Sequence, residues 1–106
     1  MSTPSHILIH RHTPGTGPQE GTPELDAEMK TWEKIDSDLR AAGQLVEGWA
    51  LNSATHTIGV IEEQSSSQVS FAVHALVVED DDAAERIAHR MPHLNYGSTA
   101  IHPLMR

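Results

Sequence analysis

The chain has 106 residues, enough for one domain with a modest core, and it carries 7 Lys and Arg against 15 Asp and Glu, a net charge of −8. This acidic balance argues against nucleic acids and anionic membrane surfaces as partners. The chain contains no cysteine, which excludes disulfides, a thiolate nucleophile and cysteine-bound zinc. No apolar stretch is long enough to span a bilayer and no secretory signal is evident, so we expect a cytoplasmic protein.

The first part of the sequence predicts a strand, a loop and a helix. Residues 6–12 are β-branched or apolar at their centre and predict a strand, and the Pro and Gly residues of 13–23 predict a flexible loop. The helix that follows is expected to have Thr22 as its N-cap and to end at Gly43. Its apolar residues recur at helical spacing; Trp32 lies on this stripe, whereas Asp36 is expected to lie off it.

The rest of the chain predicts strands at residues 45–51, 57–61, 69–78 and 97–104, with a second helix between Asp80 and Pro92. The expected order is therefore β-α-β-β-β-α-β. This order predicts a single α+β domain over residues 1–106, with an antiparallel sheet and both helices on one face. The other sheet face is expected to be apolar and to be covered by a second copy of the chain or by a ligand.

Several short motifs resemble the YCII-related proteins, and especially the branch named for an Asp-Gly-Pro-Phe tetrapeptide. They are LRAAGQLV at 39–46, VEDDDAAE at 78–85, MP at 91–92, NYGS at 95–98 and HPLM at 102–105. The resemblance implies a ferredoxin-like fold, a homodimer and a cleft between the sheet and the partner. At least one relative is a dehydrochlorinase, and a His/Asp pair is the proposed catalytic set of the family. Here the tetrapeptide is absent, the first helix has no His and residues 92–96 have no Asp, so that pair has no counterpart.

Histidine is unusually frequent, with eight copies in the chain. His74 lies in the most apolar predicted strand and is the candidate catalytic base, with a pKa tuned by burial; a structural His held by one hydrogen bond is the alternative. His10 and His12 share one face of the first strand and are expected to line the pocket. The same pair could share zinc or nickel with His74 or His102, but the spacing alone is weak evidence, and we predict no metal and no cofactor.

Two aromatic residues complete the candidate pocket. Trp49 lines an aromatic-ligand pocket or covers the open sheet face in a dimer, and Tyr96 faces the cleft or serves a turn before the last strand. We expect a YCII-related small-molecule pocket protein. If it is an enzyme, we expect a His-dependent lyase or isomerase acting on a small organic substrate. The alternative is a non-catalytic dimeric ligand-binding or accessory protein that has lost the family's His/Asp pair.

Overall fold

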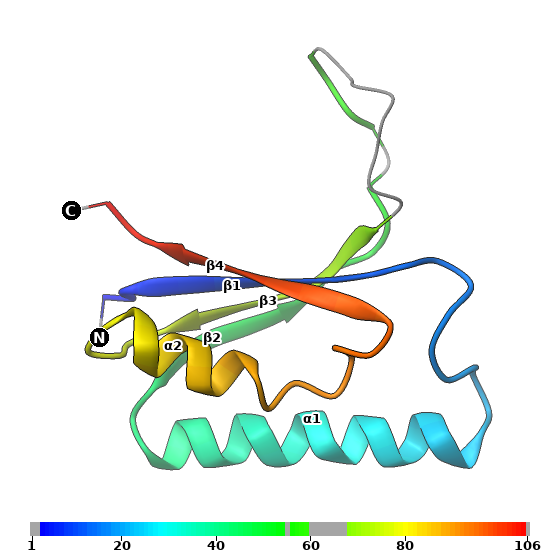
Figure 1. Cartoon of the computed structure of the whole chain (residues 1–106), viewed down its shortest axis with the longest axis horizontal. Helices are drawn as coiled ribbons and strands as arrows, with labels where there is room; N and C mark the ends of the chain where they lie inside the picture. The colour runs from blue at the N-terminus through cyan, green and yellow to red at the C-terminus, as the bar shows by residue number, and fades with distance from the viewer. Residues whose placement is uncertain (1–2, 55, 60–67, 106) are drawn as a thin grey trace.

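The computed structural model describes residues 3–54, 56–59 and 68–105, which form one sheet and two helices (Figure 1). The strands are β1 (His6–His12), β2 (Leu45–Ala50), β3 (Val69–Leu76) and β4 (Gly97–Pro103), and the helices are α1 (Pro23–Ala41) and α2 (Asp81–Ala88). In Figure 1, α1 runs beneath the strands and α2 lies in front of them. The fold is therefore α+β, as the sequence predicts.

The strands form one four-stranded antiparallel sheet in the order β2-β3-β1-β4. β1 lies between β3 and β4, and its first residue, His6, pairs with Leu76 on one side and Pro103 on the other. Because paired residues of antiparallel strands share a face, the alternation along β1 decides which side chains of all three strands meet.

The structure corrects the strand predicted at residues 57–61. The described residues 56–59 belong to no strand, Ile58 is 96% exposed, and Gly59 has a φ of +110°; residues 60–61 lie outside the described part of the chain. β-branched residues favour a strand only where a neighbouring strand supplies hydrogen bonds and a surface to pack on. β2 pairs with β3 instead, so the described order is β-α-β-β-α-β rather than β-α-β-β-β-α-β.

Both helices begin at the caps that the sequence predicts. Oγ1 of Thr22 accepts a hydrogen bond from the backbone N–H of Leu25 at 3.3 Å, and Gly43 adopts a left-handed φ of +72° just beyond the end of α1. Oδ1 of Asp80 accepts from the N–H of Ala83 at 2.8 Å at the start of α2. Among the described residues, no helix has the length and apolar character needed to cross a membrane.

Apolar side chains from the sheet, from both helices and from the turn after α2 form one core. Its buried members are Leu8, Ile35, Leu39, Leu76, Ile87, Ala88 and Met91. Removing such side chains from water is the main contribution to stability. Polar residues are buried beside this core, namely Ser5, His6, His10, His74 and His93. Buried polar groups need hydrogen-bond partners, and those partners define the site.

β3 contains one extra residue relative to β1. His10 of β1 pairs with Ala72, but the next residue of β1 pairs with Ser70, so Phe71 forms a bulge. The bulge interrupts the strict alternation predicted for residues 69–78. Phe71 consequently contacts Trp32 of α1, with the ring centroids 5.9 Å apart.

Candidate functional site

Three buried histidines meet between α1 and the sheet. His10 on β1 is 0% exposed, His74 on β3 is 4% exposed, and His93 in the turn after α2 is 0% exposed. The ring centroid of His10 lies 5.0 Å from that of His74 and 5.1 Å from that of His93. Trp32 of α1 stacks on His74 and His93, with interplanar angles of 16° and 23°.

These rings belong to a continuous series of hydrogen bonds that we call the histidine chain: Asp36, His74, His10, Thr99 and His93. Oδ1 of Asp36 lies 2.8 Å from Nε2 of His74, whose Nδ1 lies 2.8 Å from Nε2 of His10. Nδ1 of His10 lies 2.8 Å from Oγ1 of Thr99, which lies 3.1 Å from Nε2 of His93. The histidine chain thus runs from α1 across β3 and β1 to β4 and the turn before it.

Burial keeps two of these histidines neutral at pH 7. Burial, with smaller effects of the neighbouring His74 and His93, lowers the pKa of His10 from 6.5 to about 3. Burial also lowers the pKa of His93, although the Ser98 carbonyl and the Glu28 carboxylate act in the opposite direction. A neutral imidazole has one donating and one accepting nitrogen, which constrains every hydrogen bond in the histidine chain.

The Asp36 end of the histidine chain opens into a pocket of ≈ 220 Å³. The pocket is lined by Met29, Trp32, Asp36, Gly48, Trp49, Ala50, Phe71, Ala72, Val73 and His74. The side chain of Asp36 is 35% exposed, and Asp36 is the only charged residue among the described residues of this lining. Oδ2 of Asp36 has no hydrogen bond to another described residue, and Asp36 lines a largely apolar cavity.

Gly48 of β2 keeps this end of the pocket open. Gly48 pairs with His74, and a Cβ at position 48 would lie 3.2 Å from Cδ2 and 3.5 Å from Nε2 of that ring. Glycine within a strand often marks a place where another group approaches the backbone closely. A side chain at position 48 would therefore press against the His74 ring at this end of the pocket.

The structure brings several of the predicted site residues together. His74 and Trp49 line the pocket, and His10 lies directly behind His74 in the histidine chain. Trp49 is 51% exposed, and its pairing with Val73 assigns its side chain to the sheet face opposite His74. Trp49 therefore borders the pocket where β2 forms the edge of the sheet.

His12 and Tyr96, also predicted for the pocket, lie outside its lining. The ring of His12 contacts Phe71 at a centroid distance of 5.3 Å. The Tyr96 hydroxyl donates to Oε1 of Glu28 at 2.5 Å, and burial together with this carboxylate raises the pKa of Tyr96. A Cβ at Gly17 would lie 2.7 Å from the Tyr96 ring, so the loop at 13–23 comes into close contact with Tyr96.

Sequence patterns did not single out Asp36, Thr99 and His93 as site residues. Asp36 was expected to lie off the apolar stripe of α1, yet it follows Trp32 by four residues, a spacing that places two side chains on the same helix face. That spacing was the available signal. Thr99 lies directly opposite His10, which becomes visible only when the strand register is known.

The zinc or nickel hypothesis finds little support in this geometry. Both ring nitrogens of His10 are already engaged, by Thr99 and by His74. Within residues 3–54, 56–59 and 68–105, no group of three or more His, Asp or Glu side chains is arranged to hold a metal ion. The histidine chain is therefore best understood as a hydrogen-bonded network.

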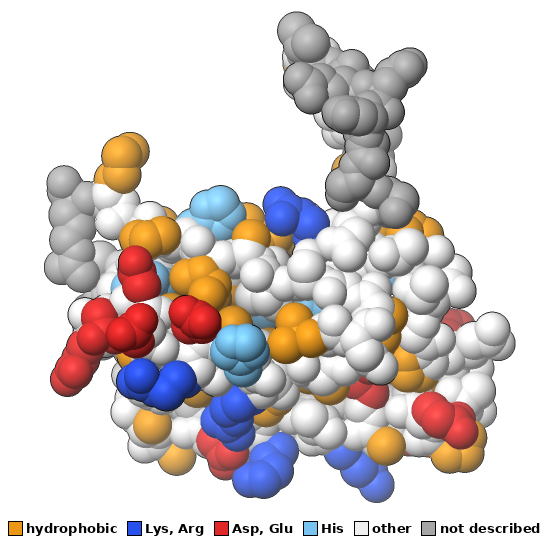
Figure 2. Space-filling view, in the orientation of Figure 1, with side chains coloured by type: hydrophobic (Ala, Val, Ile, Leu, Met, Phe, Trp, Pro, Cys, Tyr) orange, Lys and Arg blue, Asp and Glu red, His pale blue; other side chains and the backbone are white. Residues whose placement is uncertain are grey.

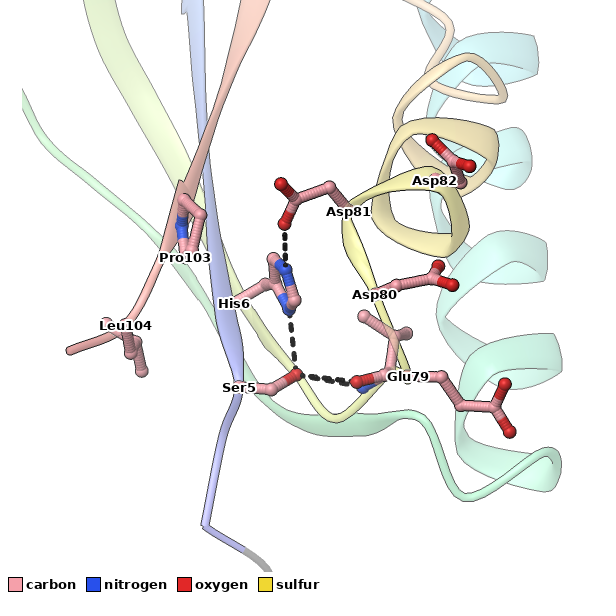
Figure 3. A pocket seen from close by; sticks show the side chains of 9 residues that line it. Ser5, His6, Glu79, Asp80, Asp81, Asp82, Pro103 and Leu104 are labelled. Carbon is pink, nitrogen blue, oxygen red and sulfur yellow. Dashed lines mark hydrogen bonds and ion pairs between the residues drawn. The ribbon is translucent and has the colours of Figure 1, made fainter. Parts of the chain in front are cut away.

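A second polar cluster lies at the start of β1, where Ser5, His6 and Asp81 line a separate pocket (Figure 3). Oγ of Ser5 is 2.9 Å from Nδ1 of His6, and Nε2 of His6 is 2.8 Å from Oδ1 of Asp81, the side-chain order of a serine hydrolase triad. However, Ser5 is buried, and its Oγ accepts from the N–H of Val78 at 2.9 Å. A nucleophile must reach its substrate, whereas this hydroxyl ties the start of β1 to the segment after β3.

Acidic side chains surround this second pocket. Glu79, Asp80 and Asp82 line it together with Asp81. Figure 2 shows Asp and Glu side chains gathered at the end of the molecule where α2 begins, with Lys and Arg side chains below them. This charge disfavours an anionic ligand at this end of the molecule.

The pocket at Asp36 has the components of a proton-transfer site. The lining includes a carboxylate that bonds a buried imidazole through one oxygen, while its other oxygen has no hydrogen bond to a described residue. No protein-family model matches the chain, and no curated protein matches its sequence. The function is therefore inferred from the geometry of the pocket and from the short motifs.

Proposed function

We propose that this protein is a YCII-related small-molecule pocket protein in which Asp36 and His74 transfer a proton on a small organic substrate, as in a lyase or isomerase. The YCII-like motifs support the family. The sheet order β2-β3-β1-β4 with two helices is compatible with a ferredoxin-like fold that has both helices on one face. Asp36 from α1 and His74 from β3 supply the two side-chain types of the family's pair from different positions.

The observation that carries the proposal is the 2.8 Å contact between the Asp36 carboxylate and a buried His74. Both ring nitrogens of His74 are engaged, by Asp36 and by His10, so the carboxylate is the group that meets the substrate. His74 then orients Asp36 and stabilises its charge, while Oδ2 removes or returns a proton. His74 itself can act as the base, as predicted from the sequence, only after one of its two hydrogen bonds opens.

The pocket favours a small, neutral or cationic substrate. Its volume of ≈ 220 Å³ lies below the range of about 300–1,000 Å³ that is usual for ligand pockets. Met29, Trp32 and Phe71 give it apolar walls, and its described lining contains no Lys or Arg to bind an anion. An anionic substrate would also be repelled by Asp36.

Hydrogen–deuterium exchange into small carbon acids tests the proposal and does not require the natural substrate. A panel of neutral ketones, enones and lactones is incubated in D₂O with the protein, and deuterium uptake is followed by NMR. Asp36→Asn should slow the catalysed exchange by about 10²–10⁴-fold, and His74→Gln should also slow it. His89→Gln, at an exposed histidine, is the control. Wild-type rates in the Asp36→Asn variant would refute the assignment.

The second candidate is a non-catalytic ligand-binding or accessory protein. It is favoured by the engagement of both His74 nitrogens within the protein, which leaves no nitrogen of this imidazole free to contact a ligand. In that case panel compounds should change the chemical shifts of the pocket residues without taking up deuterium. Binding without exchange would favour this function over the enzyme.

We further propose that a second copy of the chain covers the sheet face opposite His74. Ile7, Ile9 and Val73 alternate onto that face, and Trp49 is half exposed beside them. Light scattering should give a dimeric mass for the wild type and a monomeric mass for Ile9→Lys, with Ile58→Lys as a control at an exposed position. A monomeric wild type would exclude the dimer.

The cytoplasmic location stays a prediction.

A further inference from the structure

The donor in each hydrogen bond of the histidine chain can be assigned from the Asp36 end. An ionised carboxylate only accepts, so Nε2 of His74 carries the proton that binds Asp36. If the His74 ring carries only this proton, its Nδ1 is an acceptor and Nε2 of His10 donates to it. Since His10 is neutral, its own Nδ1 is an acceptor and the hydroxyl of Thr99 donates to it.

The hydrogen bonds at the His93 end imply the same order, in which each group donates to the next one towards Asp36. Nε2 of His93 lies 2.9 Å from the carbonyl oxygen of Ser98, which only accepts, so Nε2 carries the ring proton. The same N–H faces Oγ1 of Thr99 at 3.1 Å. Nδ1 of His93 is therefore a bare lone pair. In the described part of the chain, it is the one buried side-chain nitrogen or oxygen without a hydrogen-bond partner.

We propose that the histidine chain is a proton relay that runs from Nδ1 of His93 to the carboxylate of Asp36. A proton from solvent water, which reaches this buried atom when the protein opens locally, binds Nδ1 of His93 while the Nε2 proton of this ring passes to Oγ1 of Thr99. The Thr99 hydroxyl proton passes to Nδ1 of His10, whose Nε2 proton passes to Nδ1 of His74. Finally, the Nε2 proton of His74 passes to Oδ1 of Asp36. Each intermediate group gains one proton and loses one, and no electrons are exchanged.

The relay gives the unpartnered nitrogen of His93 a role as the entry atom. Trp32 stacks on this ring at a centroid distance of 5.4 Å, and Tyr96 adjoins it at 6.4 Å. The charged and titratable groups that face His93 from other elements are Glu28 of α1 and His10 and His12 of β1. The carboxylate of Glu28 attracts a proton to this end of the relay. The Ser98 carbonyl holds the resting proton on Nε2, so protons enter in the direction of Asp36.

This inference rests on the proposed function in one respect, because Asp36 is the group that the relay supplies with a proton. In a lyase or isomerase, Asp36 protonated on Oδ1 rotates its carboxyl group so that this proton faces the pocket, and it then acts as the acid that returns the proton to the substrate. The direction of the relay, in contrast, is a property of the free protein. It can be measured in the absence of any substrate.

The first experiment reads the ring protonation of the histidines by long-range ¹H–¹⁵N NMR of the labelled protein at pH 7. In each of the rings of His10, His74 and His93, we expect the proton on Nε2 and a bare Nδ1. A proton on Nδ1 of any of these three rings would break the continuous direction and would overturn the proposal.

The second experiment removes one hydroxyl from the middle of the relay. Thr99→Val keeps the side-chain shape and removes the donor to His10, whereas Thr99→Ser keeps the hydroxyl and serves as the matched control. Exchange of the buried Nε2 proton of His10 with D₂O should be slower in Thr99→Val than in the wild type, by a factor of about ten or more. In Thr99→Ser this exchange should be close to the wild-type rate. Equal exchange rates in the two variants would overturn the relay.

The failure of the relay and the failure of the proposed function can be told apart. Deuterium uptake by carbon acids that is lost in Asp36→Asn but unchanged in Thr99→Val would support the site and refute the relay. Slowed exchange of the His10 proton in Thr99→Val, with no uptake by any carbon acid, would support the relay and count against the enzyme. Backbone spectra of both Thr99 variants establish that they remain folded.

Discussion

The buried, neutral His10 makes stability depend on pH in a way that can be calculated. An unfolded histidine has a pKa of about 6.5, whereas burial lowers the pKa of His10 in the folded protein to about 3. Because the folded pKa is the lower one, the contribution to stability is complete above pH 6.5 and is lost as the pH falls below that value. Between pH 6.5 and about pH 3, protonation of this ring therefore favours the unfolded state.

The magnitude follows from the two pKa values. At pH 5 the unfolded state gains about 1.36 × 1.5, or about 2 kcal/mol, from protonation of His10. The folded state gains almost nothing at pH 5, because a pKa of about 3 leaves the ring neutral. The loss of unfolding free energy between pH 7.5 and pH 5 is therefore set mainly by the pKa of His10 in the unfolded state.

Urea denaturation at pH 7.5 and pH 5 measures this loss. His10→Gln cannot titrate, so the difference in unfolding free energy between the two pH values should be about 2 kcal/mol smaller in this variant than in the wild type. His89→Gln, at an exposed position, should keep most of the wild-type difference. If His10→Gln is too unstable to measure, the ¹⁵N shifts of the His10 ring in the wild type should stay constant down to pH 5. Titration of that ring near pH 6.5 would refute the reasoning.

Three further results are expected. Gly48→Ala should weaken the binding of panel compounds, measured by chemical-shift titration, because its Cβ would lie 3.2 Å from the His74 ring. Unchanged affinities would show that the compounds bind outside this pocket. Ser5→Ala should lower the free energy of unfolding by about 1–3 kcal/mol, because the N–H of Val78 loses its acceptor, and should leave deuterium uptake unchanged. Tyr96 is the only tyrosine, so the change in ultraviolet absorbance on phenolate formation reports it alone, and phenolate should form above the ordinary pKa of about 10. Phenolate formation near pH 10 would contradict the burial of this hydroxyl.

Local chemistry allowed the helix starts to be predicted. The caps Thr22 and Asp80 satisfy backbone groups within a few residues, and a sequence contains all the information that such contacts need. The strand predicted at 57–61 failed for the opposite reason. Strand formation depends on a neighbouring strand that the chain must supply from elsewhere, and the described residues 57–59 belong to no strand.

The candidate site could be predicted only in part. An unusual histidine within an apolar strand was enough to single out His74. The group that meets the pocket, Asp36, reaches His74 across 38 positions in sequence, and Thr99 is 89 positions from His10. Such contacts depend on how α1 lies on the sheet and on the strand register, which periodicity does not determine.

The shape of the pocket depends on the one extra residue in β3. Without Phe71, the strand would run from Ser70 to Ala72 in regular alternation, and the single phenylalanine of the chain would no longer lie against Trp32. One aromatic wall of the pocket thus exists because of a single inserted position. Loss of one residue here would therefore remove this wall, whereas a substitution elsewhere in the lining would leave it in place.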